Sequence, residues 1–339
     1  MSDPQPLPAA GPAVPGAVPT AVPVPVPTED LLLPGRSGRR PAARRRADGP
    51  DGDGRAAGRP GASAWHDLRT RPLVIVCTAV LVLMGLMAAF PAPFIALFTE
   101  DSGRCELSDS RVGPTAGHPF GFDLQGCDYL AQVVRGSRPS LVIGLAVTAG
   151  ALAVSVLLGL LAGYFGGWVD GLVCRVTDVF FGLPFVLGAT VVLVAFPDHG
   201  LGAMTLVLVA LGWTTMTRVM RAQVIGVRDA DFVQAARSTG AGPVRLMARH
   251  LLPNAMTPVV VVAMLNVGNV ISGEATLDFL GVGLQYPALS WGLQLNAAQA
   301  YFLDFPHLLA FPALFLSATV LSFILLGDAV RDAYDPKLR

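Results

Sequence analysis

The sequence predicts an all-α membrane protein with six transmembrane helices. Hydrophobic residues make up 53% of the 339-residue chain, charged residues make up 14%, and the mean hydropathy is +0.56. A soluble domain of this size is far less apolar. The run from Ser140 to Gly163 holds 24 residues without a charge, and a bilayer core needs roughly 20 residues of helix. Buried helices of a large soluble protein do not explain a run of this kind.

Residues 1–70 differ in composition from everything that follows. Pro-Val-Pro repeats extend to Pro27, and an Arg-rich and Gly-rich stretch comes after them. Such a segment buries too little apolar surface to offset the entropy of ordering it, so we expect a disordered cytoplasmic tail. It is not expected to be a cleavable signal peptide, because the apolar residues begin only near Leu73.

Six apolar runs are expected to cross the membrane. The first is interrupted near its outer end by Pro91 and Pro93, and the short stretch 197–200 has the composition of a tight turn between the third and fourth. The predicted spans are 73–98, 140–163, 179–196, 201–217, 257–277 and 308–327. Residues 71–139 therefore hold the first span and an outer loop, and residues 140–339 hold the core of the protein.

Arginine placement predicts the orientation of these spans. Of the 24 Lys and Arg residues, 10 precede the first span, 6 lie in 218–256, and 4 lie in the 99–139 loop. Basic residues gather on the cytoplasmic side of membrane proteins, so both termini and the 218–256 segment are expected there. The chain is therefore predicted to be a multi-pass membrane protein with both termini on the cytoplasmic side.

Two of the four cysteines share the outer loop. Cys105 and Cys127 lie on the face that is expected to be oxidising, whereas Cys77 falls in the first span and Cys174 lies beside a cytoplasmic loop. The sequence therefore predicts a disulfide between Cys105 and Cys127. Two free thiols in the same loop remain the alternative.

Several classes of enzyme are excluded by the residues present. The only lysine is Lys337, so the chain has no Gly-x-x-x-x-Gly-Lys loop for ATP and no place for a Schiff-base lysine within the spans. The five histidines are scattered without metal-ligand spacing, and no catalytic nucleophile motif is present. A net charge of zero also argues against a nucleic-acid partner. We expect no catalysis and no bound cofactor, so energy must come from a partner or an ion gradient.

The longest cytoplasmic connection, 218–256, has the pattern of a helical hairpin. Asp229 can cap a short first helix, Gly240 can end it in a left-handed conformation, and Pro243 suits the first turn of a second helix. The apolar stripe of that second helix is expected at Val244, Met247, Ala248 and Leu251. The first helix offers Phe232 and Val233 as apolar knobs, and its small residues Ala235 and Ala236 allow another protein to approach closely.

This hairpin resembles the signature loop of ABC importer permeases. That loop reads Glu-Ala-Ala, three residues, Gly, nine residues, then Ile-x-Leu-Pro. The matching positions here are Ala235, Ala236, Gly240, Leu252 and Pro253, with Gln234 in place of Glu and His250 in place of Ile. The resemblance implies that the first helix docks on a cytoplasmic ATPase subunit, through Phe232, Val233 and the matching residues.

Further stretches resemble the dipeptide, oligopeptide and nickel branch of these permeases, and in particular the second permease of such systems. The stretches begin at His118, Gly163, Gly273, Ser290 and Leu326, so the resemblance covers about 118–336. One departure is Gln125-Gly126-Cys127-Asp128, where the branch more often has Leu-Gly-Arg-Asp.

The resemblance implies an ABC type I importer permease fold, a place in a bacterial inner (plasma) membrane, and a set of partners. These are a second similar six-span permease, one fused or two cytoplasmic ATPase subunits that bind ATP and Mg²⁺, an external binding protein that delivers peptides, and membrane lipid. Transport then follows from a rigid-body switch between inward-open and outward-open states. Coupling helices carry the closure of the ATPase domains into the spans.

Glu274 and Asp278 are candidate pore and substrate residues. Both lie at the outer end of the fifth predicted span, and a charge near membrane depth is costly enough to suggest a function. Glu274 is the deeper of the two, and the ammonium group of a peptide is its natural partner. The alternative is that these groups pair near the lipid headgroups.

Two other functional classes are compatible with part of this sequence pattern. An ion-gradient-driven secondary transporter of small solutes also needs no ATP site, but no acidic residue falls in the middle of a predicted span. A membrane scaffold or receptor could use the same hairpin for docking, but it does not account for the family-like stretches outside the hairpin.

Overall fold

The computed structural model describes residues 70–99, 103–196 and 200–334. Almost all of the predicted tail, most of the tight turn and Lys337 lie outside the described residues. Within the described part of the chain, the regular structure is helical apart from three isolated β-bridges near the outer loop. This agrees with the predicted all-α class.

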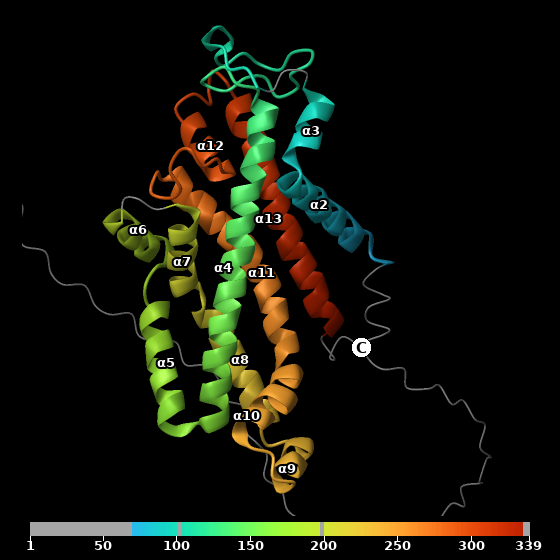
Figure 1. Ribbon diagram of the computed structural model, residues 1–339, viewed down its shortest axis with the longest axis vertical. Coiled ribbons are helices and arrows are strands. Elements are labelled where there is room, and N and C mark those ends of the chain that lie inside the picture. The colour runs from blue at the N-terminus through green and yellow to red at the C-terminus, as the bar shows by residue number, and fades with distance from the viewer. Residues whose placement is uncertain (1–69, 100–102, 197–199, 335–339) are drawn as a thin grey trace, which may run out of the picture. The chain divides into compact units, whose positions relative to one another are not determined.

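Four helices are long and apolar enough to cross a membrane (Figure 1). They are α2 (Pro72–Ala89), α4 (Tyr129–Phe165), the continuous run Pro243–Phe279 that ends in α11 (Leu252–Phe279), and α13 (His307–Tyr334). Two further spans arise if each of two bent helix pairs is counted as one. The predicted total of six spans is reached on that count.

The bent pairs are a correction to the third and fourth predicted spans. α5 (Gly167–Phe181) and α6 (Phe185–Ala195) meet at 83°, and α7 (Leu201–Gly212) and α8 (Thr214–Val227) meet at 46°. Gly182 and Pro184 lie at the first break, where Pro184 provides no backbone N–H to continue the helix. The expected span 179–196 covers α6 and only the end of α5, and the expected span 201–217 covers α7 and only the start of α8.

The predicted proline break in the first span is confirmed, whereas the helix of the second span begins at Tyr129 and not at residue 140. The first span ends at Phe90, and α3 (Pro91–Phe98) begins with Pro91 in its first turn. The second span begins earlier than expected, because the Asp128 carboxylate accepts the backbone N–H of Ala131 at 2.8 Å and caps α4. Arg135 and Arg138 therefore belong to a helix and not to a loop.

α4 is the central helix of the described core. It packs along α8, α11, α7 and α2. Glycines let these helices approach closely: a Cβ on Gly159 would lie 2.6 Å from Cβ of Met220, and a Cβ on Gly163 would lie 2.7 Å from Cβ of Val224. Small residues at such contacts are the usual means of packing helices within lipid.

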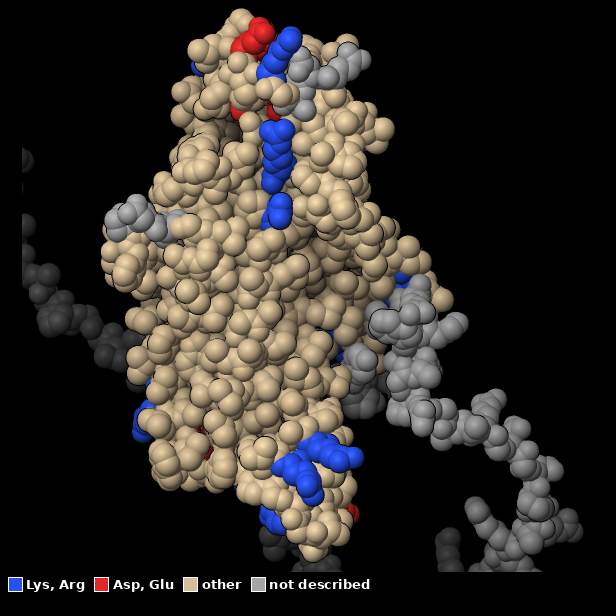
Figure 2. Space-filling view, viewed as in Figure 1, with Lys and Arg blue, Asp and Glu red and all other residues tan. Residues whose placement is uncertain are grey.

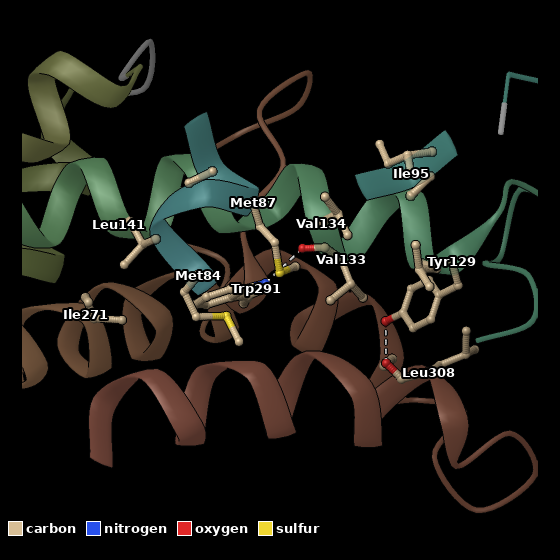
Figure 3. Packing of buried hydrophobic residues seen from close by; sticks show 14 of the residues in the cluster. Met84, Met87, Ile95, Tyr129, Val133, Val134, Leu141, Ile271, Trp291 and Leu308 are labelled. Carbon is tan, nitrogen blue, oxygen red and sulfur yellow. Dashed lines mark hydrogen bonds between the residues drawn. The ribbon is translucent and has the colours of Figure 1, made fainter. Parts of the chain in front are cut away.

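A second packing centre ties α4 to the outer helices (Figure 3). Trp291, in α12 (Trp291–Ala298), is fully buried, and its indole N–H donates to the carbonyl of Val133 at 3.0 Å. The hydroxyl of Tyr129 donates to the carbonyl of Leu308 in α13. These two hydrogen bonds join α12 and the start of α13 to the first turns of α4, so the three helices are held together at their outer ends.

Charges gather at the two ends of the described helices (Figure 2). Lys and Arg side chains lie over the outer part of α4 and over the end that carries α9 (Asp231–Ser238), and the middle of the face shown between them is mostly free of charged side chains, with a few basic side chains at its edges. A surface with few charged side chains suits the hydrocarbon layer of a membrane, because an isolated charge has a high free energy there.

Candidate functional site

The helix α9 ends in the manner that its sequence predicts. Gly240 has a φ of 86°, the left-handed conformation that glycine adopts at little cost. The N–H of Ala241 donates to the carbonyl of Ala236 at 3.1 Å, and the N–H of Gly240 donates to that of Arg237 at 3.0 Å. This bond pair is the Schellman motif, which ends a helix and turns the chain back sharply. The predicted cap at Asp229 is wrong, because Ala230 is the N-cap residue and no side chain caps the helix.

α9 presents different residues to the protein and to the solvent. Val233 is fully buried against Met220, Val224 and Leu246, and Ala236 packs at the edge of the same cluster. The exposed residues of α9 include Phe232, Gln234 and Ala235 together with Asp231, Arg237 and Ser238, and Phe232 is 45% exposed. The expected pair of apolar knobs is therefore divided, since Val233 anchors the helix and Phe232 projects from it.

The second half of the hairpin continues directly into a membrane span. α10 (Pro243–Leu246) begins with Pro243 in its first turn, and a π-helical turn, η2 (Met247–Leu251), joins it to α11. Pro253 does not break this run, because it lies in the first turn of α11, where no N–H is needed from it.

The π turn changes which side chains are buried. The expected apolar stripe included Val244, which is 75% exposed, whereas Leu246 and Leu251 are buried. A π turn holds more residues than an α turn, so a stripe counted at 3.6 residues per turn falls out of register. Leu252 packs against the same cluster as Val233, and Pro253 is exposed.

Two arginines fasten the hairpin to the neighbouring helices. The guanidinium of Arg228 donates to the carbonyl of Gly163 at 3.1 Å, which satisfies one of the carbonyls left open at the end of α4. Arg221 in α8 forms a two-pronged ion pair with Asp170 in α5, with one N···O distance of 2.6 Å. Planar, paired hydrogen bonds of this kind fix direction as well as distance.

No local pattern in the sequence predicts a role for either arginine. The nearest signal is Asp170, the last residue of the family-like stretch that begins at Gly163. A salt bridge between residues 51 positions apart in sequence has no local signature.

The exposed part of α9 has the chemistry of a docking surface and not of a catalytic one. Phe232 provides an aromatic anchor, Ala235 lets a partner approach, and Gln234 offers amide hydrogen bonds. Among the described residues, no group of three or more His, Cys, Asp or Glu residues could hold a metal ion. α8 precedes α9 in the chain and α10–α11 follow it, so α9 is connected to two helical segments that continue into candidate membrane spans.

Glu274 and Asp278 lie side by side at the outer end of α11, and both are fully buried. Asp278 accepts the backbone N–H of Leu284 at 2.6 Å and the hydroxyl of Ser290, so it holds the segment that leads to α12. Neither carboxyl oxygen of Glu274 has a hydrogen-bond partner among the described residues. Their predicted contact with substrate is not tested by this arrangement, and it stays a prediction.

The outer loop contains the predicted disulfide between Cys105 and Cys127. The N–H of Glu106 donates to the carbonyl of Gly126 at 3.1 Å beside the bridge. The imidazole of His118 and the carboxylate of Asp128 lie 2.6 Å apart, which connects the loop to the cap of α4. The bridge and the contact between His118 and Asp128 hold a segment that has little regular structure of its own.

Removing this disulfide is expected to loosen the loop without disturbing the hairpin. The bridge joins residues 22 apart, for which loop-closure entropy predicts about 3 kcal/mol of stabilisation. In a Cys105→Ala/Cys127→Ala variant, the amide of Glu106 should exchange with solvent about a hundredfold faster, while amides of α9 keep their rates. Cys77→Ala/Cys174→Ala is the matched control, because both of these thiols are free. Unchanged exchange at Glu106 would contradict the expectation.

Comparison with known proteins places these features in a family. Residues 155–339 match the family model described as "Binding-protein-dependent transport system inner membrane component". The dipeptide transport system permease protein DppC of Bacillus subtilis is 34% identical over 278 residues, which cover 81% of this chain and 85% of that protein.

Two other similar proteins belong to peptide and glutathione systems. The oligopeptide transport system permease protein OppC of Bacillus subtilis is 33% identical over 85% of this chain and 94% of its own length. The glutathione transport system permease protein GsiD of Escherichia coli O6:H1 is 35% identical over 81% of this chain and 90% of its own length. A chain of the MetNI methionine ABC transporter, solved in an inward-facing conformation, is 18% identical, with a TM-score of 0.49 over 60% of this chain and 97% of that chain.

Proposed function

The chain belongs to the family of inner-membrane components of binding-protein-dependent transport systems, and from that premise we propose that it forms one half of a peptide import path. It is a permease of an ABC importer with the type I permease fold, and permeases of this kind are transport proteins and not enzymes. We take di- and oligopeptides as the transported class, because similar permeases serve dipeptide, oligopeptide and glutathione systems.

The observation that carries this proposal is the exposed face of α9. An ATP-driven importer needs a surface that receives the movement of an ATPase, and Phe232, Gln234 and Ala235 provide one on a helix that Val233 and Arg228 hold in place. We place this hairpin and both termini on the cytoplasmic side, because Lys and Arg residues are concentrated in the segment before the first span and in 218–256, and such residues favour that side. ATP and Mg²⁺ are then bound by the partner ATPase and not by this chain.

We assign the translocation path to the side of the protein that carries the breaks between α5 and α6 and between α7 and α8. A groove of about 410 Å³ lies there, and its lining includes Phe181, Pro184, Thr214, Asn266 and Asn269. Neutral amide and hydroxyl groups can bond to any peptide backbone, and the apolar groups tolerate varied side chains. A second permease facing this groove would complete the path.

Purification of the tagged chain from native membranes in mild detergent tests the proposal. Mass spectrometry is expected to identify a P-loop ATPase, a second six-span permease and a peptide-binding protein with it. Recovery of the chain alone, from a preparation that keeps other membrane complexes intact, would reject the assignment of partners. Tripeptide uptake in a deletion strain, restored by the intact gene and its partners, then tests the substrate class.

A further inference from the structure

An ion pair lies beside the groove that we assign to the translocation path. Arg218 in α8 donates from Nη2 to Oδ1 of Asp178 in α5 at 2.8 Å. The central carbon of its guanidinium also lies 4.3 Å from the centre of the Phe181 ring, and Phe181 lines the groove. Thr214 and Thr215, which stand one helical turn before Arg218 on the same side of α8, line the groove as well. The guanidinium is therefore at the edge of the groove.

Both charges lie close to the breaks inside the two bent pairs. Asp178 stands three residues before Phe181, the last residue of α5, and Arg218 stands five residues after Trp213, where α7 meets α8. Each bent pair can cross the membrane as one broken span. A charged side chain within a span has a high free energy in lipid, so such residues face a water-filled cavity or the interior of a bundle. The Arg218 and Asp178 side chains are 42% and 59% exposed, so this surface does not suit contact with lipid.

The wall of the groove that belongs to α11 is also polar. Asn266 and Asn269 both line the groove, and both lie inside the run Pro243–Phe279 that can cross the membrane. Asn269 is exposed there. An amide that faces hydrocarbon loses its hydrogen bonds to water, which costs several kcal/mol. The exposed amide and the exposed ion pair thus indicate independently that the groove holds water or a transported molecule.

Arg218 has hydrogen-bond donors to spare. A guanidinium group carries five N–H donors in a planar fork, and among the described residues it makes one hydrogen bond, to Asp178. The aromatic ring of Phe181 restrains the position of the group. A carboxylate is bound most strongly by two parallel N–H···O bonds from one guanidinium group. The single bond to Asp178 leaves that mode of binding open to a second carboxylate.

We propose that Arg218 binds the C-terminal carboxylate of a peptide in the groove, and that Asp178 positions the guanidinium and competes with that carboxylate. This inference rests on the proposed function. A C-terminal carboxylate is common to peptides of every sequence, so one arginine can serve the whole substrate class. Asp178 keeps the guanidinium paired while the groove is empty, because an unpaired charge in a span has a high free energy. The same competition lets a bound peptide leave.

Binding of alanyl-phenylalanine to the complete transporter in lipid nanodiscs, without the binding protein, tests this inference. Arg218→Gln removes the charge and keeps an N–H donor. Asp178→Asn keeps an oxygen that can accept from Arg218 and removes the competing charge. We expect about tenfold weaker binding for Arg218→Gln, and binding at least as tight as in the unaltered protein for Asp178→Asn. Arg135→Gln is the matched control, because Arg135 is an exposed arginine that does not line the groove.

The direction of these effects separates a substrate site from a structural ion pair. A pair that only joined α5 to α8 would be weakened by either variant, so Arg218→Gln and Asp178→Asn would reduce binding together. Alanyl-phenylalanine amide, which has no carboxylate, should bind the unaltered protein about tenfold more weakly than the free acid, and Arg218→Gln should not weaken it further. Equal binding of acid and amide to the unaltered protein would overturn the assignment. So would equal losses in the two variants, or a failure of millimolar peptide to bind at all.

Uptake by proteoliposomes, with the binding protein present, distinguishes this inference from the function on which it rests. If the unaltered transporter moves no peptide, the proposed substrate class is wrong. If it moves peptides, and Arg218→Gln behaves like Arg135→Gln in both binding and uptake, the carboxylate site is wrong while the peptide function stands.

Discussion

Replacement of Phe232 by Ala is expected to uncouple this permease from its ATPase. Phe232 is the large apolar side chain that α9 exposes, and aromatic anchors of this kind contribute about 2 kcal/mol or more to an interface. The ATPase should bind the variant about thirtyfold more weakly, and peptide uptake should fall at least as far. Binding is measured by co-purification in a titration of the ATPase, and uptake is measured in proteoliposomes.

Two further variants show whether the effect belongs to this surface. Phe302→Ala is the matched control, because Phe302 is 48% exposed against 45% for Phe232 and lies outside the hairpin. Gln234→Glu introduces the carboxylate found in similar permeases, so it should leave docking intact or strengthen it. If Phe302→Ala reduced uptake as much as Phe232→Ala, or if Phe232→Ala kept full ATPase binding, α9 would not be the coupling surface.

The position of this surface could be predicted from sequence, but its orientation could not. Gly240 and Pro243 act locally, since one favours a left-handed turn and the other a helix start, so the hairpin was visible in the residues themselves. Phe232 and Val233 are adjacent and both apolar in a helix of only 8 residues. Which of them faces inward depends on Met220 and Leu246, which are remote in sequence.

The membrane spans show the same division. Hydropathy averages over a window of about 19 residues, so it detects an apolar run but is insensitive to its direction. It therefore found the runs around Pro184 and Trp213 and missed the 83° and 46° bends inside them. The π turn at Met247–Leu251 was not predicted from sequence for a related reason, because periodicity arguments assume one constant number of residues per turn.

The sequence identified Glu274 and Asp278 as unusual acidic residues but did not determine whether they contact substrate or stabilise the fold. Acidic residues near membrane depth are unusual, so Glu274 and Asp278 were reasonable functional candidates. The structure adds that both are fully buried and that Asp278 binds Leu284 and Ser290. A contact with substrate and a role in holding the outer segment then predict different results on mutation.

Asp278→Ala is expected to lower the free energy of unfolding by about 3 kcal/mol or more. The N–H of Leu284 and the hydroxyl of Ser290 would both lose an acceptor in a buried place, and each such loss costs about 1–3 kcal/mol. The surroundings cannot close the gap easily, because a Cβ on Gly292 would already lie 2.6 Å from Cβ of Asp278. Thermal unfolding of the purified permease and cleavage within 280–290 by proteinase K, a protease of broad specificity, provide the measurements.

Two matched variants separate stability from transport at this site. Asp278→Asn keeps the oxygen that Leu284 needs, so most of the stability should return. Glu274→Gln should change stability little, since neither oxygen of Glu274 has a hydrogen-bond partner among the described residues. If Asp278→Ala left the unfolding temperature and the cleavage rate unchanged but abolished uptake, Asp278 would serve the substrate and not the fold. The reverse pattern, lost stability with rescue by Asn, would show that this carboxylate holds the outer segment through its hydrogen bonds and not through its charge.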